Sequence, residues 1–134
     1  MPCHLSPRHL DEWRDAHPTL VRIVREILGL WYWPMPFIMT SIARTHAEDL
    51  ALGASGIHSS GPPWRALDFR ISHLGPHHQE QADAIAKTIN LRWAYDPTRP
   101  AKMVLFTAPH GTGPHGHVQV HAATILREQI PQRT

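Results

Sequence analysis

Histidine is the residue type in this sequence most suited to chemistry, with 12 histidines among 134 residues. Imidazole is the commonest metal ligand in proteins, and it gains and loses a proton near neutral pH. Two histidines and one carboxylate, His58, Asp68 and His117, stand at or beside expected strand positions. Three nitrogen and oxygen ligands leave one position of a zinc ion open for water, so this set has the chemistry of a hydrolytic zinc site.

The segments around these residues resemble the LAS group of zinc metallopeptidases, which includes lysostaphin-type enzymes, D-Ala-D-Ala metallopeptidases and the hedgehog signalling domain. In the D-Ala-D-Ala and phage endolysin branch the pattern is Ser-x-x-Arg, then His-x-x-Gly-x-Ala-x-Asp, then a third histidine on a strand. The resemblance implies that His58, Asp68 and His117 bind zinc and that Arg44 binds a substrate carboxylate or carbonyl. The matching segments are Thr40-Ser41-Ile42-Ala43-Arg44, His58-Ser59-Ser60-Gly61, Arg65-Ala66-Leu67-Asp68 and His115-Gly116-His117-Val118-Gln119-Val120.

The loop after the first expected ligand departs from the family pattern. Pro62-Pro63-Trp64 lengthen the segment between Gly61 and Arg65 beyond the compact motif. His58 must therefore reach the metal across a longer loop.

The general base is a second departure. Many members of the group carry a glutamate three residues before the last ligand, and Pro114 occupies that place here. His115 is the first candidate instead, because side chains two residues apart on a strand share a face and lie about 6.6 Å apart along it. His110, on the preceding loop, is the alternative and reaches the metal only if that loop folds over it.

Apolar periodicity indicates the elements that must position these residues. Segments in which apolar residues recur at helical spacing are followed by segments in which apolar and polar residues alternate, as in strands. This order predicts the α+β class, with a single domain and a mainly antiparallel sheet flanked by helices. The resemblance implies a hedgehog-like or D-Ala-D-Ala peptidase-like version of that fold. The expected helices cover 6–30 (restarting at Pro18), 45–52 and 77–90, and the expected strands cover 37–42, 65–71, 102–107 and 117–121.

Alternation along two of these strands predicts which side chains face the core. Leu67 and Phe69 are expected to point inward, which leaves Asp68 on the other face. In the last strand Val118 is expected to point inward, with His117 and Gln119 facing out. Asp68 and His117 are thus expected on the polar face of the sheet.

Composition limits the domain organisation and the class of partner. With 42% hydrophobic and 18% charged residues, the chain is expected to form one domain over 1–134, with a helical N-terminal segment 6–30, a core 37–123 and a tail 124–134 that is frayed from Arg127 to Thr134. A net charge of +2 gives no basic stripe, so we expect no nucleic-acid partner. The charge-free stretch 27–43 is shorter than a membrane span and is interrupted by prolines, so no span is expected.

The sequence therefore predicts a zinc-dependent peptidase, either a carboxypeptidase or an endopeptidase, that cleaves peptidoglycan stem peptides. The chain is expected to be a monomer and cytoplasmic at synthesis, without a signal peptide, and to reach the cell wall through a phage lysis system. The alternative is a non-catalytic zinc-stabilised binding domain or a phage structural domain. A metal nuclease is a third hypothesis, which the small excess of basic residues disfavours.

Overall fold

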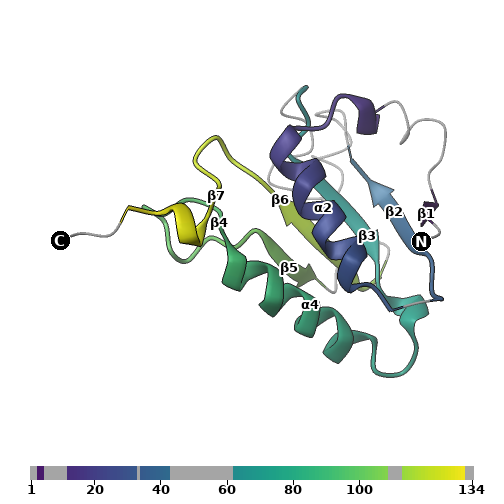
Figure 1. The fold of residues 1–134 in the computed structure, drawn as a ribbon. Coiled ribbons are helices and arrows are strands. Elements are labelled where there is room, and N and C mark those ends of the chain that lie inside the picture. The colour runs from purple at the N-terminus through teal and green to yellow at the C-terminus, as the bar shows by residue number, and fades with distance from the viewer. Residues whose placement is uncertain (1–2, 5–11, 33, 43–61, 109–112, 132–134) are drawn as a thin grey trace.

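The structure is a computed structural model that describes residues 3–4, 12–32, 34–42, 62–108 and 113–131. Its main sheet has the strand order β1-β2-β3-β6-β5, in which β1 is parallel to β2 and the other neighbours are antiparallel. Two helices pack against this sheet (Figure 1), so the predicted α+β class is confirmed. The elements are β1 (Cys3–His4), α2 (Pro18–Leu30), β2 (Phe37–Ser41), β3 (Ala66–Arg70), α4 (His78–Arg92), β5 (Leu105–Ala108) and β6 (His115–Gln119).

Four short elements complete the described part of the chain. A second, two-stranded sheet pairs β4 (Trp93–Ala94) with β7 (Ile125–Leu126), and η2 (Ser72–Leu74) and η3 (Arg127–Gln129) are 3-10 helices. The expectation of a frayed end is wrong for Arg127–Gln129, which form η3 directly after the strand that pairs with β4. Among the described residues, no helix is both long and apolar enough to cross a membrane.

Helix α2 begins at a cap that the sequence encodes. The His17 ring accepts a hydrogen bond from the Thr19 backbone N–H at 3.1 Å, and Pro18 occupies the first turn, where its missing N–H has no helical partner in any case. The buried side chains recur at helical spacing, as expected for a helix that covers a sheet. They are Leu20, Ile23, Val24 and Ile27.

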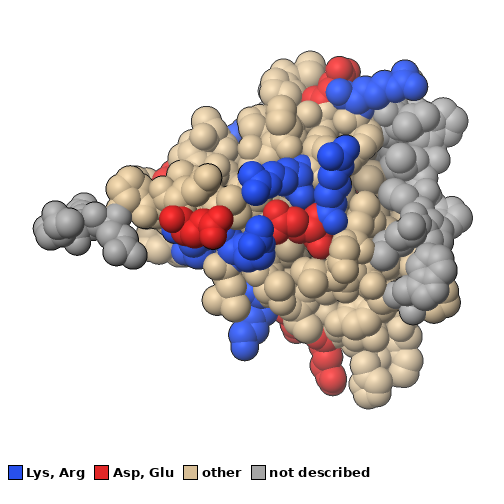
Figure 2. All heavy atoms as spheres, viewed as in Figure 1, with Lys and Arg blue, Asp and Glu red and all other residues tan. Residues whose placement is uncertain are grey.

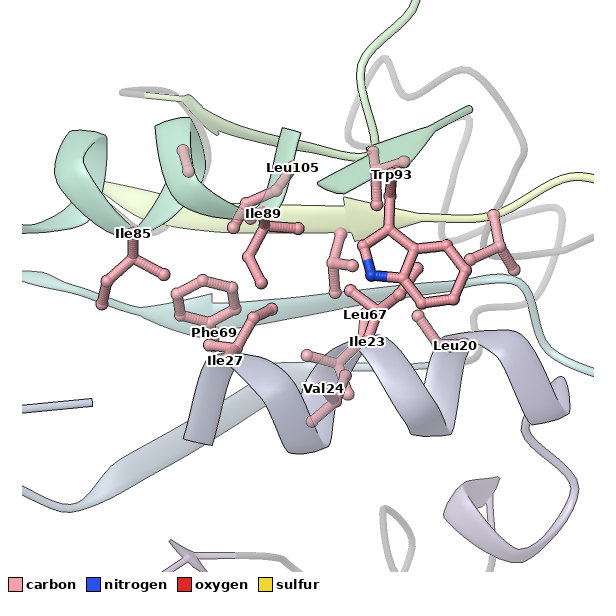
Figure 3. Packing of buried hydrophobic residues seen from close by; sticks show 14 of the residues in the cluster. Leu20, Ile23, Val24, Ile27, Leu67, Phe69, Ile85, Ile89, Trp93 and Leu105 are labelled. Atoms are coloured by element: carbon pink, nitrogen blue, oxygen red, sulfur yellow. The ribbon is translucent and has the colours of Figure 1, made fainter. Parts of the chain in front are cut away.

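Helix α4 covers the same face of the sheet, beside α2. Its buried residues are the four that the periodicity predicts, Ala82, Ile85, Ala86 and Ile89. Figure 3 shows side chains of both helices directed toward Leu67 and Phe69 of β3. This face of the sheet is therefore the core, and the alternate residues of β3 and β6 lie on the opposite face.

A single side chain of α4 fixes the edge strand β5. The Asn90 Oδ1 accepts hydrogen bonds from the backbone N–H groups of Val104 and Leu105 at 3.2 and 3.1 Å, and the Asn90 Nδ2 donates to the Leu105 carbonyl at 2.7 Å. Asn90 thus satisfies backbone groups that a neighbouring strand would otherwise pair. β5 begins at Leu105 and not at the predicted position 102, although the Val104 carbonyl still accepts a hydrogen bond from the Gln119 backbone N–H at 2.8 Å.

An aromatic cluster packs over the one residue of β6 that has no side chain. Phe69 lies opposite Gly116 in the register between β3 and β6, and its ring meets Trp31 and Phe37 at centroid distances of 5.7 and 5.0 Å. A Cβ atom on Gly116 would lie 2.7 Å or less from three atoms of the Phe69 ring. Glycine is therefore required here by close approach.

The strand that carries the candidate site residues starts earlier than predicted. β6 spans His115–Gln119 instead of 117–121, because its residues pair with the whole of β3, from Arg70 opposite His115 to Ala66 opposite Gln119. His121 lies in a turn, where its backbone N–H donates to the Thr124 hydroxyl at 2.8 Å. His115 is consequently the first residue of the strand.

The outer surface of the helical layer carries charges of both signs. Figure 2 shows Lys and Arg side chains interleaved with Asp and Glu side chains on the face formed by α2 and α4. One contact among them is the ion pair between Arg92 Nε and Glu26 Oε1 at 2.6 Å, which joins the two helices. This face offers mixed charge, as the small net charge of the sequence leads one to expect.

Candidate metal centre

Asp68 and His117 face each other across the two central strands. They are register partners in β3 and β6, and Asp68 Oδ1 lies 2.7 Å from His117 Nδ1. Only 7% of Asp68 and 9% of His117 is exposed. The predicted face, opposite that of Leu67 and Val118, is therefore correct, and both side chains are buried there.

The second ring nitrogen of His117 has its own polar partner. His117 Nε2 lies 3.2 Å from Gln119 Oε1, and Gln119 Nε2 donates to the Met103 carbonyl at 3.0 Å. The Met103 carbonyl accepts only, so it fixes the orientation of the Gln119 amide. The Phe106 ring lies over the imidazole with a centroid distance of 4.8 Å. The ring is thus held at both nitrogens and on one face.

This hydrogen-bond chain leaves a place for a positive charge. Because Gln119 Oε1 accepts from the Nε2–H of His117, a neutral imidazole would turn the lone pair of Nδ1 toward Asp68 Oδ1. The 2.7 Å contact is that of a hydrogen bond or ion pair, in which the ring donates an Nδ1–H to the carboxylate. A carboxylate oxygen and an imidazole nitrogen are also the kinds of atom that ligate zinc. Gln119 then has the position of an outer residue that orients a histidine ligand.

The same contacts distinguish the pair from a nucleophilic triad. In a Ser-His-Asp triad the carboxylate holds one ring nitrogen, and the other faces the nucleophile. Here the other nitrogen of His117 faces the amide of Gln119, which is not a nucleophile. The described contacts of this pair thus differ from those of a Ser-His-Asp triad.

His115 shares the strand face of His117 and lies opposite Arg70. Its Nδ1 is 3.0 Å from the Gly113 carbonyl, which can only accept a hydrogen bond. A neutral His115 ring therefore carries its hydrogen on Nδ1 and its lone pair on Nε2. Nε2 is therefore the ring atom that can accept a proton.

Three of the predicted site residues, His58, Arg44 and His110, lie outside the described residues, as does the expected helix 45–52. Within the described ranges, no group of three or more His, Cys, Asp or Glu side chains could hold a metal ion. The structure thus brings together two of the three predicted ligands, Asp68 and His117, and the position of the third stays a prediction.

Gln119 and Phe106 are contributors to the site that were not singled out in the sequence. The alternation of β6 placed Gln119 on the polar face, but nothing in the sequence indicated that its amide reaches the ring of His117. Phe106 lies opposite His117 in the register between β5 and β6. That register depends on long-range pairing, so a sequence pattern gives no signal for it.

The role of Gln119 predicts a measurable effect on metal affinity. Gln119→Leu introduces an apolar side chain of similar size and removes the acceptor for His117 Nε2, so zinc affinity is expected to fall by about 10- to 100-fold. Competition with a chromophoric chelator measures this affinity. Gln129→Leu, on the exposed η3, is the matched control. Equal affinity in the two variants would assign Gln119 to packing alone.

Comparison of the chain with protein-family models, with curated proteins and with solved structures finds no match. Two features of the chain therefore bear on function. One is the geometry of Asp68, His117 and the residues around them. The other is the resemblance of the sequence motifs to the zinc metallopeptidases.

Proposed function

We propose that this chain is a zinc-dependent peptidase that hydrolyses an amide bond in peptidoglycan stem peptides. The observation that carries the proposal is the buried Asp68–His117 pair at 2.7 Å, because these are two of the three ligands that the motifs imply. The choice of peptidoglycan as substrate rests on the resemblance of the motifs to the D-Ala-D-Ala and endolysin branch.

The residues of the proposed site have distinct roles. Asp68 and His117, with His58, would hold zinc, and when bound the ion supplies Lewis-acid activation of water. Gln119 orients His117. His115 would accept a proton from the attacking water and return it to the leaving amine.

Two further assignments belong to the same proposal but concern residues outside the described ranges. Arg44 would bind a carboxylate or carbonyl of the peptide, and His110 is the alternative proton acceptor. We also propose that the chain acts on the cell wall after release by a phage lysis system, as a monomer and without a nucleic-acid partner.

Mass spectrometry of purified peptidoglycan fragments tests the proposal directly. Incubation with the zinc-loaded chain is expected to release products shortened by cleavage of one amide bond, with a gain of one water for each bond cut. A chelator should stop the reaction, and added zinc should restore it. Bound zinc without any cleavage would contradict the peptidase assignment and support a zinc-stabilised binding domain.

A further inference from the structure

A surface pocket lies between the first turn of α2 and the two-stranded sheet of β4 and β7, and the proposed chemistry does not use it. Its volume is about 320 Å³, which is at the lower end of the range for small-molecule sites. Because α2 covers the core face of the main sheet, whereas Asp68 and His117 lie on the other face, the pocket is separate from the candidate metal centre. The residues that line it include Pro18, Thr19, Arg22, Trp93, Ile125 and Leu126.

The lining carries one positive charge in a fixed place. Arg22 is the only charged residue among the described residues that line the pocket. Its guanidinium carbon lies 5.1 Å from the centroid of the Trp93 ring. Trp93 is buried, and Figure 3 shows its indole directed from β4 toward Leu20 and Ile23 of α2. A guanidinium held over a buried aromatic ring loses less side-chain entropy when it binds a ligand than a freely moving one does.

The charge of Arg22 is not used inside the described part of the chain. No carboxylate there forms an ion pair with Arg22. The carboxylate of Glu26, one helical turn further along α2, has other partners. Its Oε1 accepts a hydrogen bond from Arg92 Nε at 2.6 Å, and its Oε2 accepts one from Trp93 Nε1 at 3.1 Å. The edge of the Arg22 guanidinium therefore keeps hydrogen-bond donors for an external anion.

The composition of the lining defines the class of that anion. One positive charge and no negative charge among the described lining residues match a ligand with a single negative charge. A planar guanidinium binds a carboxylate through two parallel hydrogen bonds. Pro18, Ile125 and Leu126 add an apolar wall to the same pocket. A carboxylate attached to a short apolar body therefore complements both parts of the lining.

We propose that this pocket binds a small monocarboxylate with an apolar body. Its carboxylate is bound by the edge of the Arg22 guanidinium, and its apolar body contacts Pro18, Ile125 and Leu126. The inference goes beyond the proposed peptidase and does not depend on it, because no lining residue belongs to the candidate metal centre. It gives the chain a second ligand site, on the helical side of the main sheet.

Titration of the full chain with hexanoate, followed by ¹H–¹⁵N NMR spectra, tests this site. Hexanoate is expected to shift the indole N–H signal of Trp93 and the backbone signals of the first turn of α2, with a Kd of the order of 1 mM. Hexanamide lacks the charge and should bind about 10-fold more weakly. Acetate lacks the apolar body and should also bind about 10-fold more weakly.

Substitution of Arg22 shows whether its guanidinium recognises the carboxylate. Arg22→Gln should bind hexanoate no better than hexanamide, and Arg22→Lys should keep part of the preference, because it retains the charge and loses the planar fork. Arg25→Gln is the matched control. Arg25 is also exposed on α2 but does not line the pocket, so this variant should keep the full preference for hexanoate.

Three results would overturn the inference. They are equal binding of hexanoate and hexanamide by the wild type, an unchanged preference in Arg22→Gln, and equal weakening in Arg22→Gln and Arg25→Gln, which would assign the effect to general surface charge. Zinc-free and zinc-loaded chains should bind hexanoate equally. Shifts confined to β3 and β6 of the zinc-loaded chain would place the acid at the metal centre and would also contradict the proposal. Failure to cleave peptidoglycan would leave this site unaffected.

Discussion

Replacing His117 with alanine is expected to abolish zinc binding and peptidase activity together. The substitution removes one of the three proposed ligands and leaves the Asp68 carboxylate, only 7% exposed, without its 2.7 Å partner. Loss of an outer residue that orients a ligand already costs about 10- to 100-fold in metal affinity, so loss of the ligand itself should exceed about 100-fold. Metal analysis of the purified variant and release of peptidoglycan fragments measure the two effects.

Two companion variants show whether the loss is specific to the metal site. Asp68→Asn keeps the shape of the side chain but removes its charge, and it should lose zinc as His117→Ala does. His115→Ala should keep zinc while the rate falls by about 10²- to 10⁴-fold, the usual contribution of a positioned general base. Unchanged zinc content in both Asp68→Asn and His117→Ala would refute the assignment of the ligands.

Gly116→Ala is expected to destabilise the fold by about 3 kcal/mol, at the upper end of the cost of overpacking a core. The added methyl group would lie 2.7 Å or less from three atoms of the Phe69 ring. That ring cannot move aside easily, because it is 2% exposed and packs against Trp31 and Phe37. Thermal unfolding should report a decrease of about 10 °C in Tm.

The chain contains a matched control for this substitution. A Cβ atom on Gly29, in the last turn of α2, would have nothing within 4 Å, so Gly29→Ala should leave Tm unchanged or raise it slightly. Phe69→Leu in the Gly116→Ala background should recover part of the loss, because the smaller side chain makes room for the methyl group. If Gly116→Ala had the same Tm as Gly29→Ala, the prediction would be wrong. The strands β3 and β6 would then be able to move apart at Gly116 with little loss of stability.

The two long helices were predictable because each buries a continuous stripe of apolar side chains along one face. All four expected core residues of α4 are buried, and α2 begins at the predicted Pro18. The two-residue strands β4 and β7 were not predictable, because two residues are too few to show an alternating pattern. Their pairing over a long sequence separation also explains why the segment after position 124 is more regular than expected.

The sequence was enough to predict the two residues at the centre of the candidate site, Asp68 and His117. It was not enough to predict the residues that surround them. Alternation placed Asp68 and His117 on one face of the sheet, and the register confirms that they are partners. The position of Arg70 beside His115 follows from the same register, but the sequence alone does not specify which residues of two strands lie opposite each other. The contact between Gln119 and His117 depends in addition on side-chain conformation.

The hydrogen bonds of Asn90 have a consequence for the behaviour of the chain at high concentration. β5 is the last strand of the main sheet, and an open strand edge is a template on which a second chain can add and start aggregation. Asn90 occupies both the N–H and the carbonyl of Leu105, so an incoming strand finds these groups already used. The side chain of Asn90 therefore also keeps Leu105, the first residue of this edge strand, from pairing with a second chain.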